Sequence, residues 1–192
     1  MEDKKNTYFA SFTERVGENI IEEMRKTTQE EEQNIRASYA ESTIEYITSN
    51  DFVDLILRDS IFIMEFSIKL QEFRGSSDDL IVGRQIYTSI VIADLIMLEN
   101  QLPYFIFDKL FGPYSMAFCA FETPDRLILE LFSLHTKIKT TTKFNHFTDM
   151  FRCVYEESLD QSLQLNDSSM PAIREMKNAD SLSRVGVEFK VN

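Results

Sequence analysis

Three residues that could build a nucleophilic site share one face of a predicted helix: His146, Asp149 and Cys153. A Cys–His pair is reactive only when the base lies within hydrogen-bond reach of the thiol. Seven residues of helix place His146 about 10 Å from Cys153, so the spacing argues against a nucleophile. His135 has no metal-ligand spacing around it, and the chain contains no HExxH, P-loop, GxGxxG or GxSxG motif.

Two aspartates, Asp59 and Asp94, occupy positions that the helical pattern assigns to apolar faces. A buried carboxylate is costly unless it is paired, so each could be an acid or base with a shifted pKa, or a structural ion pair or cap. The structural role is favoured, with Arg36 or Arg84 as the partner of Asp59, because ion-pair networks also perturb carboxylates. If Asp94 is buried, Asp94→Leu should destabilise the fold by roughly 1–3 kcal/mol, because a donor loses its acceptor.

A dense polar patch, Glu99, Asn100 and Gln101, lies between two leucines just before Pro103. Its amides could bind a ligand. More often such residues satisfy the backbone groups left unpaired at a helix end before a proline-led turn, so the structural role is again favoured.

The elements that must position these residues are predominantly helical. Apolar residues at helical spacing predict helices over 8–24, 29–47, 50–73, 86–98, 103–111, 123–139 and 145–157. The stretch 86–98 is apolar on almost every side, which is typical of a helix in the centre of a domain. Alternating residues over 186–191 predict a short strand. We therefore expect a mainly α fold around a central buried helix at 85–98, with a helical domain over 1–165 and a linker and terminal turn or strand over 166–192.

Composition narrows the classes of function. The chain has 192 residues, a net charge of −12, 43% hydrophobic residues, and few Gly and Pro. Binding duplex nucleic acid needs a basic face, so we expect no nucleic-acid partner. Cys119 and Cys153 form neither a zinc motif nor a disulfide framework, and no metal or cofactor is expected. The charged start and the lack of a long apolar run predict no signal peptide and no membrane span in this chain.

Four motifs resemble, in order, those of the plant family known as domain of unknown function 247. The central run DLIMLENQLPYFIFDKLF, from Asp94 to Phe111, is the longest. RASYAE at 36–41 resembles the family's Arg-x-x-Tyr-x-Glu element, and LRDSIFIME at 57–65 its Leu-x-Asp-Gly-Cys-Phe-Ile-x-Glu element, with Ser-Ile in place of Gly-Cys. ADSLSRVGVEF at 179–189 is similar to its Ala-x-x-Leu-x-x-Ala-Gly-Val-x-Phe element.

The resemblance implies a function. The family has no established enzymatic activity or cofactor, and some grass members are implicated in self-incompatibility. It implies a non-enzymatic plant interaction or recognition module, in self-incompatibility or signalling, whose partner is a receptor-like protein or another family member. The matched residues are then scaffold: Arg36, Tyr39, Asp59, Asp94, Glu99, Asn100, Gln101 and Pro103.

Two alternatives stay open. One is an enzyme or small-ligand binder that uses Asp59 or Asp94 with Asn100 and Gln101. The other is a regulatory competitor of longer family members, because the family's usual opening and its C-terminal portion, which commonly carries a membrane-spanning helix, are missing here. We expect a location in the cytoplasm or at the periphery of a membrane.

Overall fold

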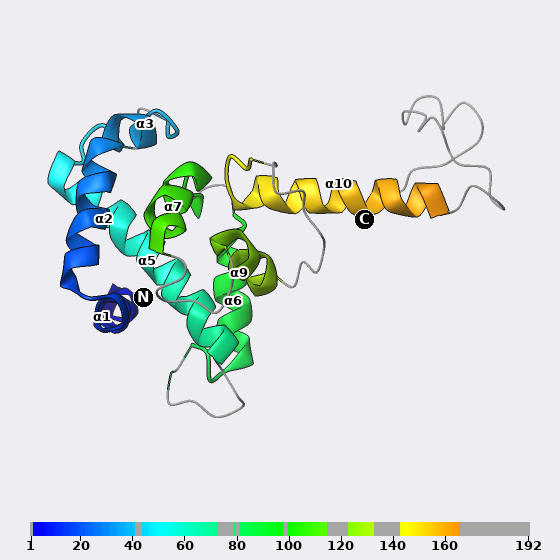
Figure 1. The fold of residues 1–192 in the computed structure, drawn as a ribbon, viewed down its shortest axis with the longest axis horizontal. Coiled ribbons are helices and arrows are strands. Elements are labelled where there is room, and N and C mark those ends of the chain that lie inside the picture. The colour runs from blue at the N-terminus through cyan, green and yellow to red at the C-terminus, as the bar shows by residue number, and fades with distance from the viewer. Residues whose placement is uncertain are drawn as a thin grey trace, which may run out of the picture. The chain divides into compact units, whose positions relative to one another are not determined.

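The computed structural model describes residues 2–40, 44–72, 79, 81–97, 100–114, 123–132 and 143–165, without the side chains of 2 and 157–165. Its elements in chain order are α1 (Glu2–Val16), α2 (Glu18–Glu30), α3 (Glu32–Arg36), α5 (Ser49–Glu72), α6 (Gln85–Leu95), α7 (Tyr104–Phe111), the 3-10 turn η2 (Gly112–Tyr114), α9 (Pro124–Leu131) and α10 (Phe147–Leu165) (Figure 1). The predicted mainly α fold is confirmed. The strand predicted at 186–191 lies outside the described residues.

The chain divides into two compact units, 1–154 and 155–192, and each is considered by itself. The boundary predicted at 165 falls inside the second unit, at the last residue of α10, and stays a prediction. Everything below concerns the first unit.

The central helix of this unit is α5, which contacts α1, α2, α3 and α9 (Figure 1). Its middle is buried on every side, from Ser60 to Ile68. Rings from neighbouring elements complete the core: Tyr8 and Phe12 of α1 are fully buried, as are Phe107 and Phe111 of α7. Burial of this much apolar surface is the main favourable term in folding.

The prediction that 85–98 forms the central buried helix is wrong. Only Val91 and Leu95 of α6 are buried, whereas Ile86 and Ile90 keep 68% and 54% of their surface exposed. A helix that is apolar on all sides can be buried, but its sequence does not require it. Which helix lies in the centre of the unit depends on how the other helices pack around it. The charged residues of α5 obtain partners from α1 and α2, so its charges do not keep it at the surface.

Local signals set most helix ends. Pro103 directly precedes α7, and Pro124 is the first residue of α9, close to the predicted starts at 103 and 123. The Thr123 hydroxyl caps α9 by accepting a bond from the Arg126 amide. The helix predicted over 8–24 is instead broken at Gly17, whose φ of 91° is one that L side chains rarely adopt. The helix predicted over 29–47 is replaced by the short α3, and α5 is capped by Thr48, which exchanges two hydrogen bonds with Asp51.

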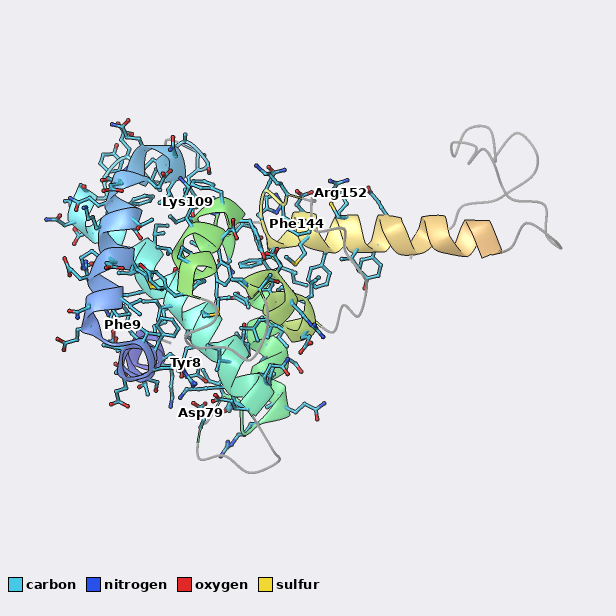
Figure 2. All side chains as sticks on the ribbon, in the orientation of Figure 1. Tyr8, Phe9, Asp79, Lys109, Phe144 and Arg152 are labelled. Atoms are coloured by element: carbon cyan, nitrogen blue, oxygen red, sulfur yellow. The ribbon has the colours of Figure 1, made fainter. Side chains whose placement is uncertain are left out.

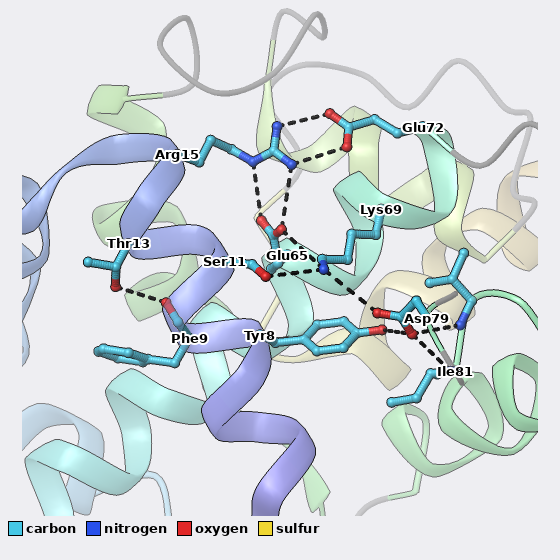
Figure 3. Close-up of polar contacts among 11 residues, drawn as sticks. Tyr8, Phe9, Ser11, Thr13, Arg15, Glu65, Lys69, Glu72, Asp79 and Ile81 are labelled. Atoms are coloured by element: carbon cyan, nitrogen blue, oxygen red, sulfur yellow. Dashed lines mark hydrogen bonds and ion pairs between the residues drawn. The ribbon is translucent and has the colours of Figure 1, made fainter. Parts of the chain in front are cut away.

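A polar network joins α1 to α5 (Figure 3). The Arg15 guanidinium bridges two carboxylates of α5: it donates to Glu65 at 3.3 Å and to Glu72 at 2.9 Å. Glu65 is only 1% exposed, and this burial raises the pKa of its carboxyl group although Arg15 and then Lys69 favour its charged form. The network therefore holds a charged group in the centre of the core.

The same network continues to Asp79 (Figures 2 and 3). Asp79 accepts the Tyr8 hydroxyl at 2.9 Å and the backbone amide of Ile81 at 2.9 Å, and Lys69 lies 3.7 Å away. Burial opposes ionisation of Asp79, but these donors together lower the pKa of its carboxyl group. Burial, followed by the bond to Asp79, raises the pKa of Tyr8. Asp79 thus anchors the turn that leads into α6 against α1 and α5.

The raised pKa of Glu65 makes a prediction about pH. Below the unfolded pKa of about 4.3 the group is protonated in both states, and its charge adds no cost. As the pH rises from there through the raised folded pKa, the unfolded chain ionises first, so the folded state loses stability. Glu65→Gln carries no charge at any pH, so its stability relative to the unsubstituted protein should increase between about pH 4 and pH 7. Urea unfolding at several pH values measures the difference.

The control is Glu72→Gln, which removes the exposed partner of the same arginine. A Glu65→Gln difference that is constant with pH, or that moves in the opposite direction, would show that burial does not control this carboxylate.

Candidate functional site

A pocket of about 280 Å3 lies between α5 and α6 and is closed by residues from α1 and two connecting segments. Residues that carry the family resemblance meet there from four places in the sequence: Tyr39, Asp59, Asp94, Asn100 and Gln101. The pocket is thus the place where the residues singled out from the sequence come together.

Apolar side chains form the floor of the pocket. Phe52, Ile56 and Ile63 come from α5, Val91 and Leu95 from α6, and Leu102 from the segment before α7; all are buried. The pocket is open to solvent where Leu55, Asp94 and Asn100 are exposed. Ligand pockets in proteins share this composition of an apolar interior with few polar groups.

Asp59 forms an ion pair with Lys5 of α1, whose ammonium lies 2.5 Å from Oδ1. Both side chains are partly exposed, at 29% and 23%. The predicted structural ion pair is therefore present, but Lys5 takes the place of Arg36 or Arg84. Burial, followed by the nearby Asp59 charge, raises the pKa of the Tyr39 hydroxyl to about 12. Tyr39 therefore stays protonated at neutral pH and acts as a donor.

Asp94 is exposed, which contradicts the expectation of a buried carboxylate inside a central helix. The reason is that α6 turns this face to solvent. Its Oδ1 accepts a hydrogen bond from the Asn100 amide at 2.8 Å. Water can replace Asn100 here, so the substitution cost that a buried aspartate implies does not apply.

Asn100 and Gln101 cap the C-terminal end of α6. The Gln101 amide donates to the carbonyls of Leu95 at 2.8 Å and Met97 at 2.6 Å, and Asn100 donates to the Asp94 carbonyl at 3.3 Å. The last carbonyls of a helix have no partner within the helix, and these amides supply one. This is the role that the sequence favoured for the patch.

Gln101 also joins α6 to two other parts of the unit. Its backbone carbonyl accepts the Tyr39 hydroxyl at 3.1 Å, and its side-chain oxygen accepts the Thr148 amide near the start of α10 at 3.3 Å. The Thr148 hydroxyl in turn donates to the Ile96 carbonyl at 2.9 Å. The backbone and side chain of Gln101, together with Thr148, therefore fix where α6 ends relative to the rest of the pocket.

Arg36 does not line the pocket but contacts three residues that do. It donates to the carbonyls of Ile44 at 3.0 Å and Ile47 at 2.9 Å, and its guanidinium lies 4.1 Å from the centre of the Phe52 ring. These three residues line the pocket, so Arg36 shapes its wall without entering it. Pro103 is buried and directly precedes α7, with an extended backbone (φ −60°, ψ 123°). Glu99 lies outside the described residues.

His146, Asp149 and Cys153 do not form a nucleophilic site. His146 precedes α10, and its Nδ1 accepts the Asp149 amide at 3.1 Å. Asp149 accepts the Asn145 amide at 3.0 Å and pairs with Arg152. The bond from Asn145, the strongest influence, lowers the pKa of the Asp149 carboxyl group. These contacts begin a helix. His135 and Cys119 lie outside the described residues.

Most polar side chains of the pocket are engaged with one another or with helix ends. Over the described ranges, no group of three or more His, Cys, Asp or Glu residues is placed to hold a metal ion. In the same part of the chain, no helix is long and apolar enough to cross a bilayer. Lys5 was missed by the sequence analysis, because nothing in the sequence links it to Asp59, 54 positions away.

The contacts predict different roles for two pocket residues. Gln101→Ala removes the partners of two helix-end carbonyls and of the Thr148 amide, and should cost about 1–3 kcal/mol. Asp94→Leu removes one exposed hydrogen bond and should change stability by no more than about 0.5 kcal/mol. Urea unfolding of the two variants in parallel measures both. Equal destabilisation would mean that Asp94, like Gln101, belongs to the scaffold.

Comparison with known proteins identifies the family to which the chain belongs. Neither the curated proteins nor the solved structures contain a significant match to this chain. One family model matches residues 1–192, the whole chain, and it describes a plant protein of unknown function. The chain therefore belongs to the plant family DUF247, as its sequence motifs indicated.

Proposed function

We propose that this protein is a non-enzymatic interaction module that binds its partner through the outer face of α6. Four large apolar side chains are exposed on or just beyond this helix: Ile86 at 68%, Tyr87 at 44%, Ile90 at 54% and Met97 at 46%. Exposed apolar side chains gathered on one element mark interaction surfaces more often than scattered ones do. This gathering is the observation that carries the proposal.

The spacing of the surface favours a helical partner. Ile86, Ile90 and Ala93 of α6, and Met97 two residues beyond its end, are all exposed and follow one another at intervals of four, three and four residues. This is the spacing of a helix–helix seam, in which apolar side chains of one helix insert between those of another. Ala93 is small and allows a close approach. An amphipathic helix laid along α6 would cover this outer stripe, which we define as these four residues.

Charge indicates what flanks the partner's apolar face. The chain carries 20 Lys and Arg against 32 Asp and Glu, a net charge of −12. Two copies of such a chain repel each other, whereas basic residues beside the partner's seam are attracted and speed association. The occupant that fits is a basic amphipathic helix of another protein.

The enzyme alternative is less well supported. Three of the four polar residues it would use are held by other groups: Asp59 by Lys5, Asn100 by Asp94, and Gln101 by three backbone groups. The fourth, Asp94, is exposed at the rim of the pocket, where water reaches it. A general acid or base needs access to a substrate proton. The engagement of these side chains favours a module over a catalyst.

We further propose that the partner is a receptor-like protein or another family member, and that binding serves self-incompatibility or signalling. This narrower proposal is supported by the family's role in grasses rather than by geometry. A stripe of exposed side chains suits recognition, because its residues can be exchanged without disturbing the core. Ile86 and Ile90 are exposed, so substitutions at these positions leave the core unchanged.

Two synthetic peptides test the docking surface. Both are three heptads long with Leu at the seam positions; one carries Lys and the other Glu at the flanking positions. We expect the Lys peptide to bind and the Glu peptide to bind at least about tenfold more weakly, because one favourable charge contact is worth about that factor. Fluorescence anisotropy with labelled peptide, at concentrations where the peptide is monomeric, measures both.

Substitutions locate the binding. Ile90→Asp places a charge in the centre of the outer stripe and should abolish binding of the Lys peptide without lowering the melting temperature, since Ile90 is exposed. Tyr46→Ser, which removes an exposed aromatic side chain that is not part of α6, should leave binding intact. Binding that survives Ile90→Asp, or failure of both peptides to bind, would refute the proposed surface.

A further inference from the structure

The pocket behind α6 is a site separate from the outer stripe. Val91, Asp94 and Leu95 line it, whereas Ile86, Ile90 and Met97 do not. A pocket of about 280 Å3 lies just below the usual range for ligand sites, which runs from about 300 to 1,000 Å3. Its occupant is therefore a small molecule, with an apolar body that can replace water against Ile56, Ile63 and Leu102.

The charged groups around the pocket select the head of that molecule. Among the described residues that line the pocket, one ammonium, Lys5, stands against two carboxylates, Asp59 and Asp94, which gives a net charge of −1. Lys5 is already paired with Asp59 at 2.5 Å, which leaves Asp94 as the charge in excess. An anionic head would meet repulsion, and a cationic donor would meet attraction.

Asp94 has the capacity to receive such a donor. Its Oδ1 accepts from Asn100 at 2.8 Å, while its Oδ2 accepts no hydrogen bond from the described part of the chain. An ionised carboxylate oxygen beside an apolar cavity binds an ammonium group through a charge-assisted hydrogen bond. Its exposure leaves the site accessible from solvent.

We propose that this pocket binds a small primary amine with an apolar body: the body lies on the floor between α5 and α6, and the ammonium group donates to Asp94. The site is independent of partner docking, because neither Asp94 nor the floor belongs to the outer stripe.

Three probes with one aromatic body test the head-group preference: 1-naphthylmethylamine, 1-naphthalenemethanol and 1-naphthoate. They are cationic, neutral and anionic at pH 7. Titration calorimetry on the full chain should give the tightest binding for the amine and at least about tenfold weaker binding for the carboxylate, the factor expected for one charge-assisted contact.

Two substitutions assign the preference to Asp94. Asp94→Asn retains an oxygen that can bond to Asn100 but removes the charge, and should weaken amine binding to about the level of the alcohol. Glu22→Gln removes the same charge from an exposed position of α2 outside the pocket and should leave the preference unchanged. Val91→Phe fills the pocket and should abolish binding of all three probes; Leu55→Trp at the opening serves the same purpose if Val91→Phe fails to fold.

The proposal is overturned if the carboxylate binds as tightly as the amine, if none of the probes binds, or if Asp94→Asn and Glu22→Gln reduce amine binding equally. It is also overturned if pocket-filling variants that fold still bind the amine. The peptide result on Ile90→Asp is unaffected by any of these outcomes, so the two proposals fail separately.

Discussion

Glu65 keeps a carboxylate in the core of this protein with 1% of its surface exposed, and the rest of the arrangement depends on how that group is held. Arg15 reaches it from α1, and Lys69 lies 4.0 Å away on the next turn of α5. Breaking a buried ion pair is far more costly than forming it is favourable, so Arg15 fixes α1 against α5. Lys5 with Asp59, and Arg25 with Asp54, repeat the arrangement along the same helix. Cations from α1 and α2 thereby allow α5 to occupy the centre despite its charges.

Because α5 takes the centre, α6 is placed at its margin and acquires two different sides. Val91 and Leu95 complete the pocket on the inner side, and the outer stripe remains uncovered on the other. The Gln101 side-chain amide ends the helix and ties that end to the start of α10, and the Gln101 backbone carbonyl accepts the Tyr39 hydroxyl. The features proposed to bind a partner and a small amine therefore have one structural origin.

Signals confined to a few residues predicted the structure well. Pro103 and Thr123-Pro124 mark helix starts through their own backbone and side-chain chemistry, and the amides before Pro103 cap the preceding helix. Pairings between distant segments could not be predicted: Arg15 and Glu65 are 50 positions apart. Without them α5 resembles an amphipathic surface helix, and the uniformly apolar 86–98 is the better candidate for the centre. The break at Gly17 had a signal, a glycine within a helical pattern, whose effect depended on the positive φ found there.

The claim that α5 is central and α6 peripheral can be measured directly through isoleucine methyl groups. A soluble paramagnetic compound broadens the NMR signals of methyls that solvent reaches, and both helices carry several isoleucines. The structure predicts strong broadening for Ile86 and Ile90 and little for Ile61 and Ile63, measured on dilute protein so that no second copy covers α6. Protection of Ile86 and Ile90 equal to that of Ile61 would contradict the account, because α6 would then be a core helix and its outer stripe would not be a surface.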